Sequence, residues 1–252
     1  TQAVWGRFFF HFLSLVIFFI IFRPKINLKK NFKTQIIRSI LMVTATFFMF
    51  QSLQRFDLVD IYVVFFTAPL IVSLLSAYFL KDILTLKGVA LMLLSFGSII
   101  YSLGPSMKVL SPELIFPIVP PICWALYQFF TKVISGDNDP FAAIFYTAIL
   151  GAIIFSSYML FNWEPLDKNI YWIYLIFLGL AGFISHSLII YAIQLSNLSF
   201  VTNFQYSQLI WSTIINFFIF GVPVDINKFV GVLGIILFGI LFIRTEGTKK
   251  II

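Results

Sequence analysis

The chain of 252 residues is 60% hydrophobic and 11% charged, with a formal net charge of +7. Soluble domains carry about 25% charged residues, so this composition excludes a water-soluble globular protein and predicts a polytopic membrane protein. The single cysteine, Cys123, excludes an intramolecular disulfide framework.

Nine apolar stretches follow one another along the chain. A helix needs about 20 apolar residues to cross the hydrocarbon core of a membrane, so each stretch is predicted to be a spanning helix. In chain order, the predicted helices cover residues 3–22, 35–53, 59–80, 87–104, 113–134, 139–161, 170–193, 200–221 and 228–244. Their connections are short, which predicts an all-α membrane bundle without a soluble domain.

Two pairs of residues recur at the same spacing in the two halves of the chain. Asp82 and Gly88 recur as Asp225 and Gly231, each 143 positions later, and the apolar runs beside them recur with them. One such period contains five predicted helices, and an odd number of spans inverts the membrane orientation of the second copy. This pattern is typical of secondary transporters, whose substrate sites lie at the repeat interface. A fortuitous match of two apolar helix pairs is the alternative.

The repeat predicts a helical bundle of five plus five. We expect a first repeat over residues 1–107, with four helices, and a second over residues 108–252, with five. The helix at 113–134 has no counterpart in the first repeat, because its counterpart would precede Thr1. We therefore expect ten helices in the full repeat, with nine present here and the first one missing. A nine-helix protein that breaks the repeat is the alternative.

Charged residues orient the predicted helices. If the first helix runs from outside to inside, twelve of the 17 basic residues, Arg38 among them, fall on the inner side. The outer side keeps Arg7, Arg55, Lys108, Lys168 and Lys228. This positive-inside bias predicts a cytoplasmic C-terminus. The densest basic run, residues 23–33, is expected to face anionic lipid headgroups, so the net charge requires no nucleic-acid partner.

Several segments resemble one known family of membrane proteins. The run FTAPL at residues 66–70, followed by Asp82 and Gly88, resembles the fourth and fifth helices of the drug/metabolite transporter superfamily, EamA type. The second half matches further, with WALY at 124–127, FQYSQLIW at 204–211 and RTE at 244–246.

The resemblance covers essentially the whole chain. It implies a transporter in a bacterial cytoplasmic (inner) membrane, closest in pattern to members that take up S-adenosylmethionine or riboflavin. Asp82 takes the place of the acidic residue that commonly follows the fourth helix of the family. One departure lies at residues 199–203, SFVTN, where the ninth helix of the family usually begins with small residues and a proline. This departure leaves the substrate contacts at that helix start open.

Polar side chains inside the predicted spans are candidates for function, because hydrocarbon offers them no hydrogen-bond partner. Arg7 and His11 share one face of the first helix, as an outer gate or a contact for an anion. The alternative is that Arg7 reaches the lipid headgroups and His11 bonds a carbonyl. His186 lies in the middle of its span, as a site or gating residue, or as a tolerated polar position between Ser185 and Ser187.

The predicted helix at 200–221 carries the largest group of such side chains. Asn203, Gln205, Tyr206 and Gln208 place amides and a phenol on more than half of its circumference. With aromatic and amide groups of the helix at 113–134, they suit a planar metabolite with hydrogen-bonding edges. The predicted substrate-binding residues are Trp124, Tyr127, Gln128, His186, Asn203, Tyr206 and Trp211. Aromatic packing and an interfacial belt are the alternative.

The sequence carries no motif for catalysis, for a metal or for a cofactor. All ten acidic residues are expected at helix ends, in loops or in the tail. We therefore predict a transporter, not an enzyme, that moves a small organic metabolite, such as a planar nucleoside-like or aromatic solute, by alternating access. Its expected partners are that solute and membrane lipids, and no oligomeric state is assigned. The alternatives are a membrane enzyme acting on lipid, with His11 or His186 as base, and a scaffold that transports nothing.

Overall fold

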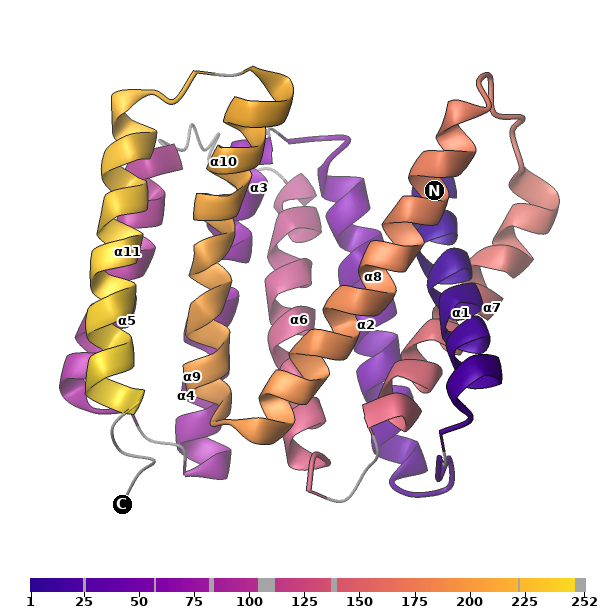
Figure 1. The fold of residues 1–252 in the computed structure, drawn as a ribbon, viewed down its shortest axis with the longest axis horizontal. Coiled ribbons are helices and arrows are strands. Elements are labelled where there is room, and N and C mark those ends of the chain that lie inside the picture. Colours follow the sequence, from indigo (N-terminus) through magenta and orange to yellow (C-terminus); the bar gives the residue numbers. More distant parts are fainter. Residues whose placement is uncertain are drawn as a thin grey trace. The chain divides into compact units, whose positions relative to one another are not determined.

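A computed structural model describes residues 1–24, 26–56, 58–81, 84–103, 112–136, 140–221 and 223–247. Within these ranges every regular element is a helix, so the predicted all-α class is confirmed (Figure 1). Asp82, which the sequence singled out, lies outside the described residues.

Six helices of the described chain are long and apolar enough to cross a membrane. They are Gln2–Phe22, Ile61–Leu80, Pro112–Val133, Pro140–Asn162, Ile170–Leu195 and Ile226–Glu246. Each agrees with a predicted span to within a few residues. The helix at Leu86–Ser102 is apolar but shorter.

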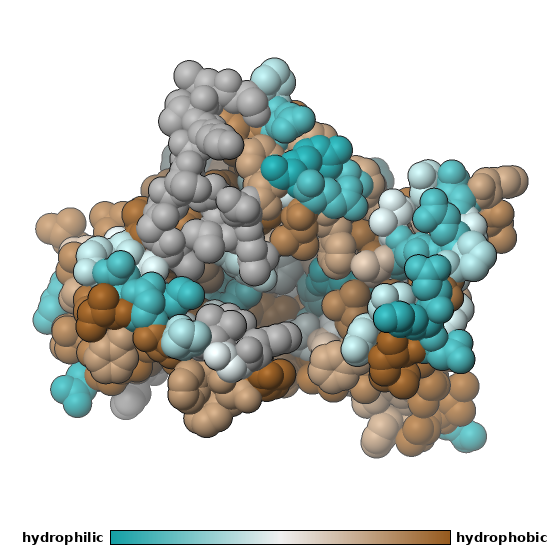
Figure 2. All heavy atoms as spheres, turned by 90° about the horizontal axis from the view of Figure 1, so that it is seen from above, coloured by the Kyte–Doolittle hydropathy of each residue, from teal (hydrophilic) through white to brown (hydrophobic). Residues whose placement is uncertain are grey.

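The outer side chains match a lipid environment. Phe161, Phe177 and Phe218 expose 88%, 70% and 78% of their surface, although all three are large and apolar. Exposed apolar area on this scale would make a soluble protein aggregate, whereas a bilayer covers it. In a view toward one end of the helices, hydrophilic residues gather on the end face and hydrophobic ones project at the flanks (Figure 2).

The chain forms two compact units, and each unit combines a segment from each half of the sequence. Unit 1 comprises residues 1–50 and 126–195, and unit 2 comprises residues 51–125 and 196–252. The helices of unit 1 are α1 (Gln2–Phe22), most of α2 (Phe32–Ser52), the second part of α6 (Ile115–Val133), α7 (Pro140–Asn162) and α8 (Ile170–Leu195).

Within unit 1, helix α1 packs closely against both α7 and α8. Gly151 of α7 accommodates the ring of Phe8, and Gly179 of α8 lies against the backbone of Phe10 and His11. Small residues let membrane helices approach closely, which replaces the hydrophobic driving force that lipid removes. These contacts fix the position of α1, which carries two of the candidate site residues.

Unit 2 holds the remaining elements. They are α3 (Leu58–Phe65), α4 (Ala68–Leu75), the π-helical turn η1 (Ser76–Leu80), α5 (Leu86–Leu103), the short 3₁₀ turn η2 (Pro112–Leu114), the first part of α6, α9 (Leu198–Asn203), the 3₁₀ turn η3 (Phe204–Ser207), α10 (Gln208–Phe220) and α11 (Ile226–Gly247). Helices α5 and α11 lie side by side along their lengths (Figure 1).

The contacts between α5 and α11 follow the sequence repeat. Gly88 of α5 lies against Glu246 near the end of α11, and Gly231 of α11 lies against Ser102 near the end of α5. The 143-residue shift aligns Gly88 with Gly231, and it aligns Glu246 with position 103, next to Ser102. The two glycines therefore occupy equivalent positions in an antiparallel helix pair. We keep the division at 107/108 as a proposal about the sequence repeat.

The predicted helix at 59–80 is broken in the structure. Helix α3 ends at Phe65, and α4 begins at Ala68 with Pro69 in its first turn. Proline has no N–H to donate, so it is tolerated in a first turn but interrupts a continuous helix. At the break, the backbone N–H and the hydroxyl of Thr67 both donate to the carbonyl of Val64, at 3.0 and 2.6 Å.

The predicted helix at 200–221 is also interrupted. A 3₁₀ turn at Phe204–Ser207 separates α9 from α10. The tighter turn advances about 120° per residue instead of 100°, which shifts the angular positions beyond residue 203 relative to a continuous α-helix. Tyr206 is buried, while Trp211 is 61% exposed.

Helix α11 continues past its predicted end at residue 244. It reaches Gly247, which places Glu246 in its last turn with only 8% exposure. The Glu246 carboxylate accepts hydrogen bonds from the backbone N–H and the hydroxyl of Thr85, at the start of α5. Glu246 therefore lies at a helix end, one of the positions expected for the acidic residues.

Candidate functional sites in the two units

Unit 2 contains a cavity of about 230 Å³ beside the segment formed by α9, η3 and α10. Its walls come from α5, from α11 and from the segment formed by α9, η3 and α10. The lining residues are Ser95, Asn203, Phe204, Tyr206, Ser207, Ile210, Ile235, Ile236, Gly239, Ile240 and Ile243. Most of this surface is aliphatic, so the few polar groups on it decide which ligand it can hold.

Two of those polar groups are buried oxygens that lack a partner. Asn203 and Tyr206 are 6% and 1% exposed, and neither Asn203 Oδ1 nor the Tyr206 hydroxyl makes a hydrogen bond within the described residues. Leaving such a group unpaired costs about 1–3 kcal/mol. An amide oxygen accepts hydrogen bonds, and a phenol can donate or accept, so the pair is chemically ready for a ligand with polar edges.

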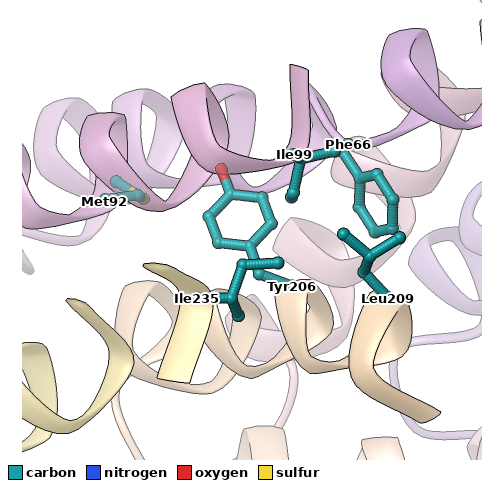
Figure 3. Close-up of a cluster of buried hydrophobic side chains, with 6 residues drawn as sticks. All are labelled: Phe66, Met92, Ile99, Tyr206, Leu209 and Ile235. Atoms are coloured by element: carbon teal, nitrogen blue, oxygen red, sulfur yellow. The ribbon is translucent and has the colours of Figure 1, made fainter. Parts of the chain in front are cut away.

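The Tyr206 ring is held by apolar neighbours. It packs with Phe66, Met92, Ile99 and Ile235, and the Phe66 ring meets it edge-on at 6.1 Å between centroids. Its hydroxyl points toward the helix that carries Met92 and Ile99 (Figure 3). The ring is thus fixed by packing, while the hydroxyl is left for another partner.

Trp124 joins the same segment through one hydrogen bond. Its indole Nε1 donates to Gln205 Oε1 at 3.1 Å, which ties the first part of α6 to η3 next to Asn203 and Tyr206. Trp211, by contrast, is exposed on α10 and does not line the cavity. The structure therefore brings Asn203 and Tyr206 together at the cavity. Trp124 does not line the cavity but bonds Gln205, which lies between Asn203 and Tyr206 in the chain. Trp211 lies elsewhere on unit 2.

Unit 1 brings together a second group of predicted residues. Arg7 Nη2 lies 2.9 Å from His186 Nε2. Because a guanidinium only donates, His186 Nε2 must accept, so the imidazole is neutral with its proton on Nδ1. His11 stacks on His186, with ring centroids 5.8 Å apart and planes inclined by 15°, and Tyr127 meets the other side of His186 edge-on at 6.1 Å.

Tyr127 also contacts Arg38, a residue that the sequence analysis counted among the basic residues of the inner side. Arg38 is fully buried, and its guanidinium lies 4.6 Å from the centroid of the Tyr127 ring. It donates to the Tyr127 hydroxyl at 2.8 Å, to Thr131 Oγ1 and Gln35 Oε1 at 3.0 Å, and to the Ala143 carbonyl at 2.7 Å. This burial was not predicted from the sequence.

A signal for this burial was present in the sequence. Gln35, Arg38, Ser39, Met42 and Thr46 recur at the spacing of one helix face. All five are at most 3% exposed in the structure. A polar stripe of this kind on a spanning helix indicates a face turned toward other helices, because hydrocarbon would leave its groups unpaired. Gln128, the last predicted residue, is also fully buried, one position beyond Tyr127 on α6.

Comparisons with known proteins agree with the architecture. The model of the EamA-like transporter family matches residues 1–104 and 111–245. The S-adenosylmethionine uptake transporter of Rickettsia bellii (strain RML369-C) is 23% identical over 221 residues, which cover 87% of this chain and 75% of that protein. A solved protein crystal structure superposes with a TM-score of 0.78 at 14% identity, over 94% of this chain and 86% of that one. At that identity the superposition shows the fold alone.

Proposed function

Because the chain belongs to the EamA-like transporter family, and is therefore a membrane transporter, we propose that it moves a small organic metabolite across the membrane by alternating access. The family that the sequence resembled is confirmed by the match over residues 1–104 and 111–245. The identity of the solute and the transport cycle are our proposals.

One observation carries the proposed substrate site. Asn203 Oδ1 and the Tyr206 hydroxyl are buried at a cavity and unpaired within the described residues. Nothing in hydrocarbon can satisfy them, whereas a solute with a polar edge can. A bound solute then gains two hydrogen bonds for which the protein gives up no existing bond. Binding is favoured because the cost of two unpaired groups disappears.

The cavity suits a flat solute, or one flat end of a larger solute. Its volume of about 230 Å³ is below the roughly 300 Å³ of the smallest drug-sized pockets. Aromatic and aliphatic walls from Phe204, Tyr206 and Ile210 can cover the faces of a ring. Asn203 Oδ1 can accept from an exocyclic N–H at the edge of that ring. A nucleobase has this combination of apolar faces and hydrogen-bonding edges.

S-adenosylmethionine is the first solute to test, because a relative is named for its uptake and it carries an adenine ring. The purified full chain in liposomes should admit labelled S-adenosylmethionine, and a metabolite mixture supplied beside it would reveal other solutes by mass spectrometry of the liposome contents. Protein-free liposomes are the control. If no solute enters, the transport proposal is wrong. If a lipid or solute is chemically converted instead, the enzyme alternative is correct.

Alternating access has its own test. A carrier that returns loaded exchanges internal for external solute, so unlabelled solute trapped inside should accelerate the entry of labelled solute several-fold. A channel shows no such acceleration. Equal initial rates with empty and preloaded liposomes would contradict the proposed cycle.

The proposed orientation has the C-terminus in the cytoplasm of a bacterial cell. This proposal depends on the excess of basic residues on the expected inner side. A protease-cleavable tag after Ile252 should be protected in intact spheroplasts and cleaved after they are permeabilised. Cleavage in intact spheroplasts would reverse the orientation.

A further inference from the structure

Two arginines of unit 1 lie within its helices. Arg7 lies in α1 and Arg38 in α2, and a guanidinium stays protonated in proteins. In the described part of the chain, the side chains that contact these two guanidiniums are all neutral. The described carboxylates of unit 1, at Glu164 and Asp167, are in the segment between α7 and α8 rather than in a helix. A charge at membrane depth without a counter-ion is costly and marks a functional position.

The N–H groups of Arg38 are largely occupied by acceptors of the protein itself. Four of its five N–H groups bond acceptors that belong to α2, α6 and α7, and its side chain is fully buried. These bonds join three helices, so Arg38 acts as a positioning residue and leaves little capacity for a ligand.

The N–H groups of Arg7 have fewer acceptors than those of Arg38. It makes one short hydrogen bond, to His186 at 2.9 Å, and a long one of 3.4 Å to Thr46 Oγ1. No acceptor meets its Nε–H within the described residues. The Nε side faces Gly182, where an added Cβ would still lie 3.9 Å away. Arg7 as a whole residue is half-buried, whereas Arg38 is fully buried.

The buried unpaired polar atoms of His11, near Arg7, and of Gln35, near Arg38, are nitrogens. His11 is 1% exposed and its Nε2 has no partner within the described residues, one helical turn from Arg7. Gln35 Nε2 is likewise buried and unpaired; its amide orientation is fixed because Gln35 Oε1 accepts from Arg38. In unit 2 the comparable unpaired atoms of Asn203 and Tyr206 are oxygens. Unit 1 therefore has an unpaired amide N–H donor at Gln35, an unpaired ring nitrogen at His11 and the positive charge of two guanidiniums.

We propose that Arg7, with His11, binds an anionic oxygen group, a carboxylate or a phosphate, carried by the transported solute. Such a group supplies both the acceptors and the negative charge that unit 1 lacks, and guanidinium to oxyanion bonds are among the strongest hydrogen bonds in proteins. This assignment of a solute class rests on the proposed transport function. An anionic lipid headgroup has the same chemistry and is the competing source, because Arg7 lies about 8 Å along α1 from Gln2.

The test measures binding rather than flux. The purified full chain, in neutral detergent at constant ionic strength, is heated with sodium acetate, with sodium phosphate, with neutral acetamide or with sodium chloride. A ligand that binds the folded state raises the melting temperature with its concentration. Acetate or phosphate should raise it, and acetamide and chloride should not. If acetate and phosphate do no more than acetamide and chloride, the proposal is overturned.

Variants then locate the binding. Arg7→Gln should weaken the apparent affinity for the effective anion by roughly tenfold to a hundredfold, the loss of one charge-assisted bond, and Arg7→Lys should restore part of it. Arg55→Gln is the matched control, because Arg55 belongs to unit 2, where it bonds the carbonyl and side chain of Gln51 and lies 4.1 Å from the centroid of the Phe116 ring. A wild-type response in Arg7→Gln would overturn the assignment.

A second variant and a comparison of lipids distinguish the remaining outcomes. If Arg7→Gln does not fold, His11→Phe, which keeps a ring next to His186 and removes the N–H, should weaken anion binding roughly fivefold; an unchanged affinity would count against the site. If only phosphatidylglycerol stabilises the protein through Arg7, and phosphatidylcholine, acetate and phosphate do not, the site holds a lipid headgroup and the solute assignment is overturned. Because no arm requires flux, a failure of transport remains separable from a failure of this site.

Discussion

Gly179→Ala should separate α1 from α8 and weaken unit 1. A Cβ at residue 179 would lie 2.7 Å from the backbone nitrogen of His11 and 2.8 Å from the carbonyl carbon of Phe10. The nearest atom, Cβ of Phe10, would lie 2.3 Å away, and ordinary contact begins near 3.4 Å, so the helices would have to separate by about 1 Å. Backbone atoms cannot rotate away as the end of a flexible side chain can.

The expected cost follows from that displacement. A gap of about 0.5–1 Å forfeits a quarter to a half of the dispersion energy between the surfaces involved, and overpacking typically costs about 1–3 kcal/mol. Alanine recovers about 1 kcal/mol of helix propensity. We therefore expect a net loss of up to about 2 kcal/mol, or up to roughly 8 °C in melting temperature for a chain of this length.

Gly182→Ala is the matched control on the same helix. Its Cβ would lie 3.8 Å from Arg7 Cγ and 3.9 Å from His11 Nδ1, which is ordinary contact. The melting temperatures of both variants in one detergent, with transport rates in liposomes, provide the comparison. Gly182→Ala should equal or exceed the wild type in stability. If Gly179→Ala is as stable as Gly182→Ala, the close packing of α1 on α8 is wrong.

Three other substitutions test separate contacts. Arg38→Met should lower the free energy of unfolding in SDS titrations by about 3 kcal/mol, because it removes the hydrogen bonds from Arg38 to the Tyr127 hydroxyl, to Thr131 Oγ1 and to the Ala143 carbonyl; Arg55→Met serves as its control and should change little. Glu246→Ala should cost about 1–3 kcal/mol in the same titration, because the Thr85 N–H loses its acceptor, and Glu246→Gln should cost less because an oxygen remains. Trp124→Phe removes the bond to Gln205 and should lower transport several-fold in liposomes at normal membrane abundance; unchanged transport would count against a role for this bond.

The sequence predicted the helices well where a single physical signal dominates. Long apolar runs define α7 and α8, because the length of hydrocarbon to be crossed sets the length of the helix. The shift that aligned Gly88 with Gly231 also placed both glycines in equivalent contacts between α5 and α11. These features depend on local composition and on the repeat, both of which a single sequence records.

The features that the sequence did not reveal depend on tertiary contacts. The 3₁₀ turn at 204–207 contains neither glycine nor proline, so no helix-breaking residue predicts it. Arg38 was counted with the basic residues of the inner side, and its burial was not predicted, although the polar stripe around it indicated a face turned toward other helices. The break at Pro69 could have been predicted from the absent N–H of proline.

The most direct test of the central claim is the uptake of the identified solute by Tyr206→Phe. This change deletes only a hydroxyl that has no partner within the described residues, so the fold loses no hydrogen bond and its stability should stay equal or rise. A solute that bonds this hydroxyl should enter about tenfold more slowly at subsaturating concentration, the equivalent of roughly 1.4 kcal/mol. Tyr101→Phe is the matched control, because it removes a bond to Asn227 on the same unit and should leave uptake unchanged. Wild-type uptake and apparent affinity in Tyr206→Phe would contradict the substrate site.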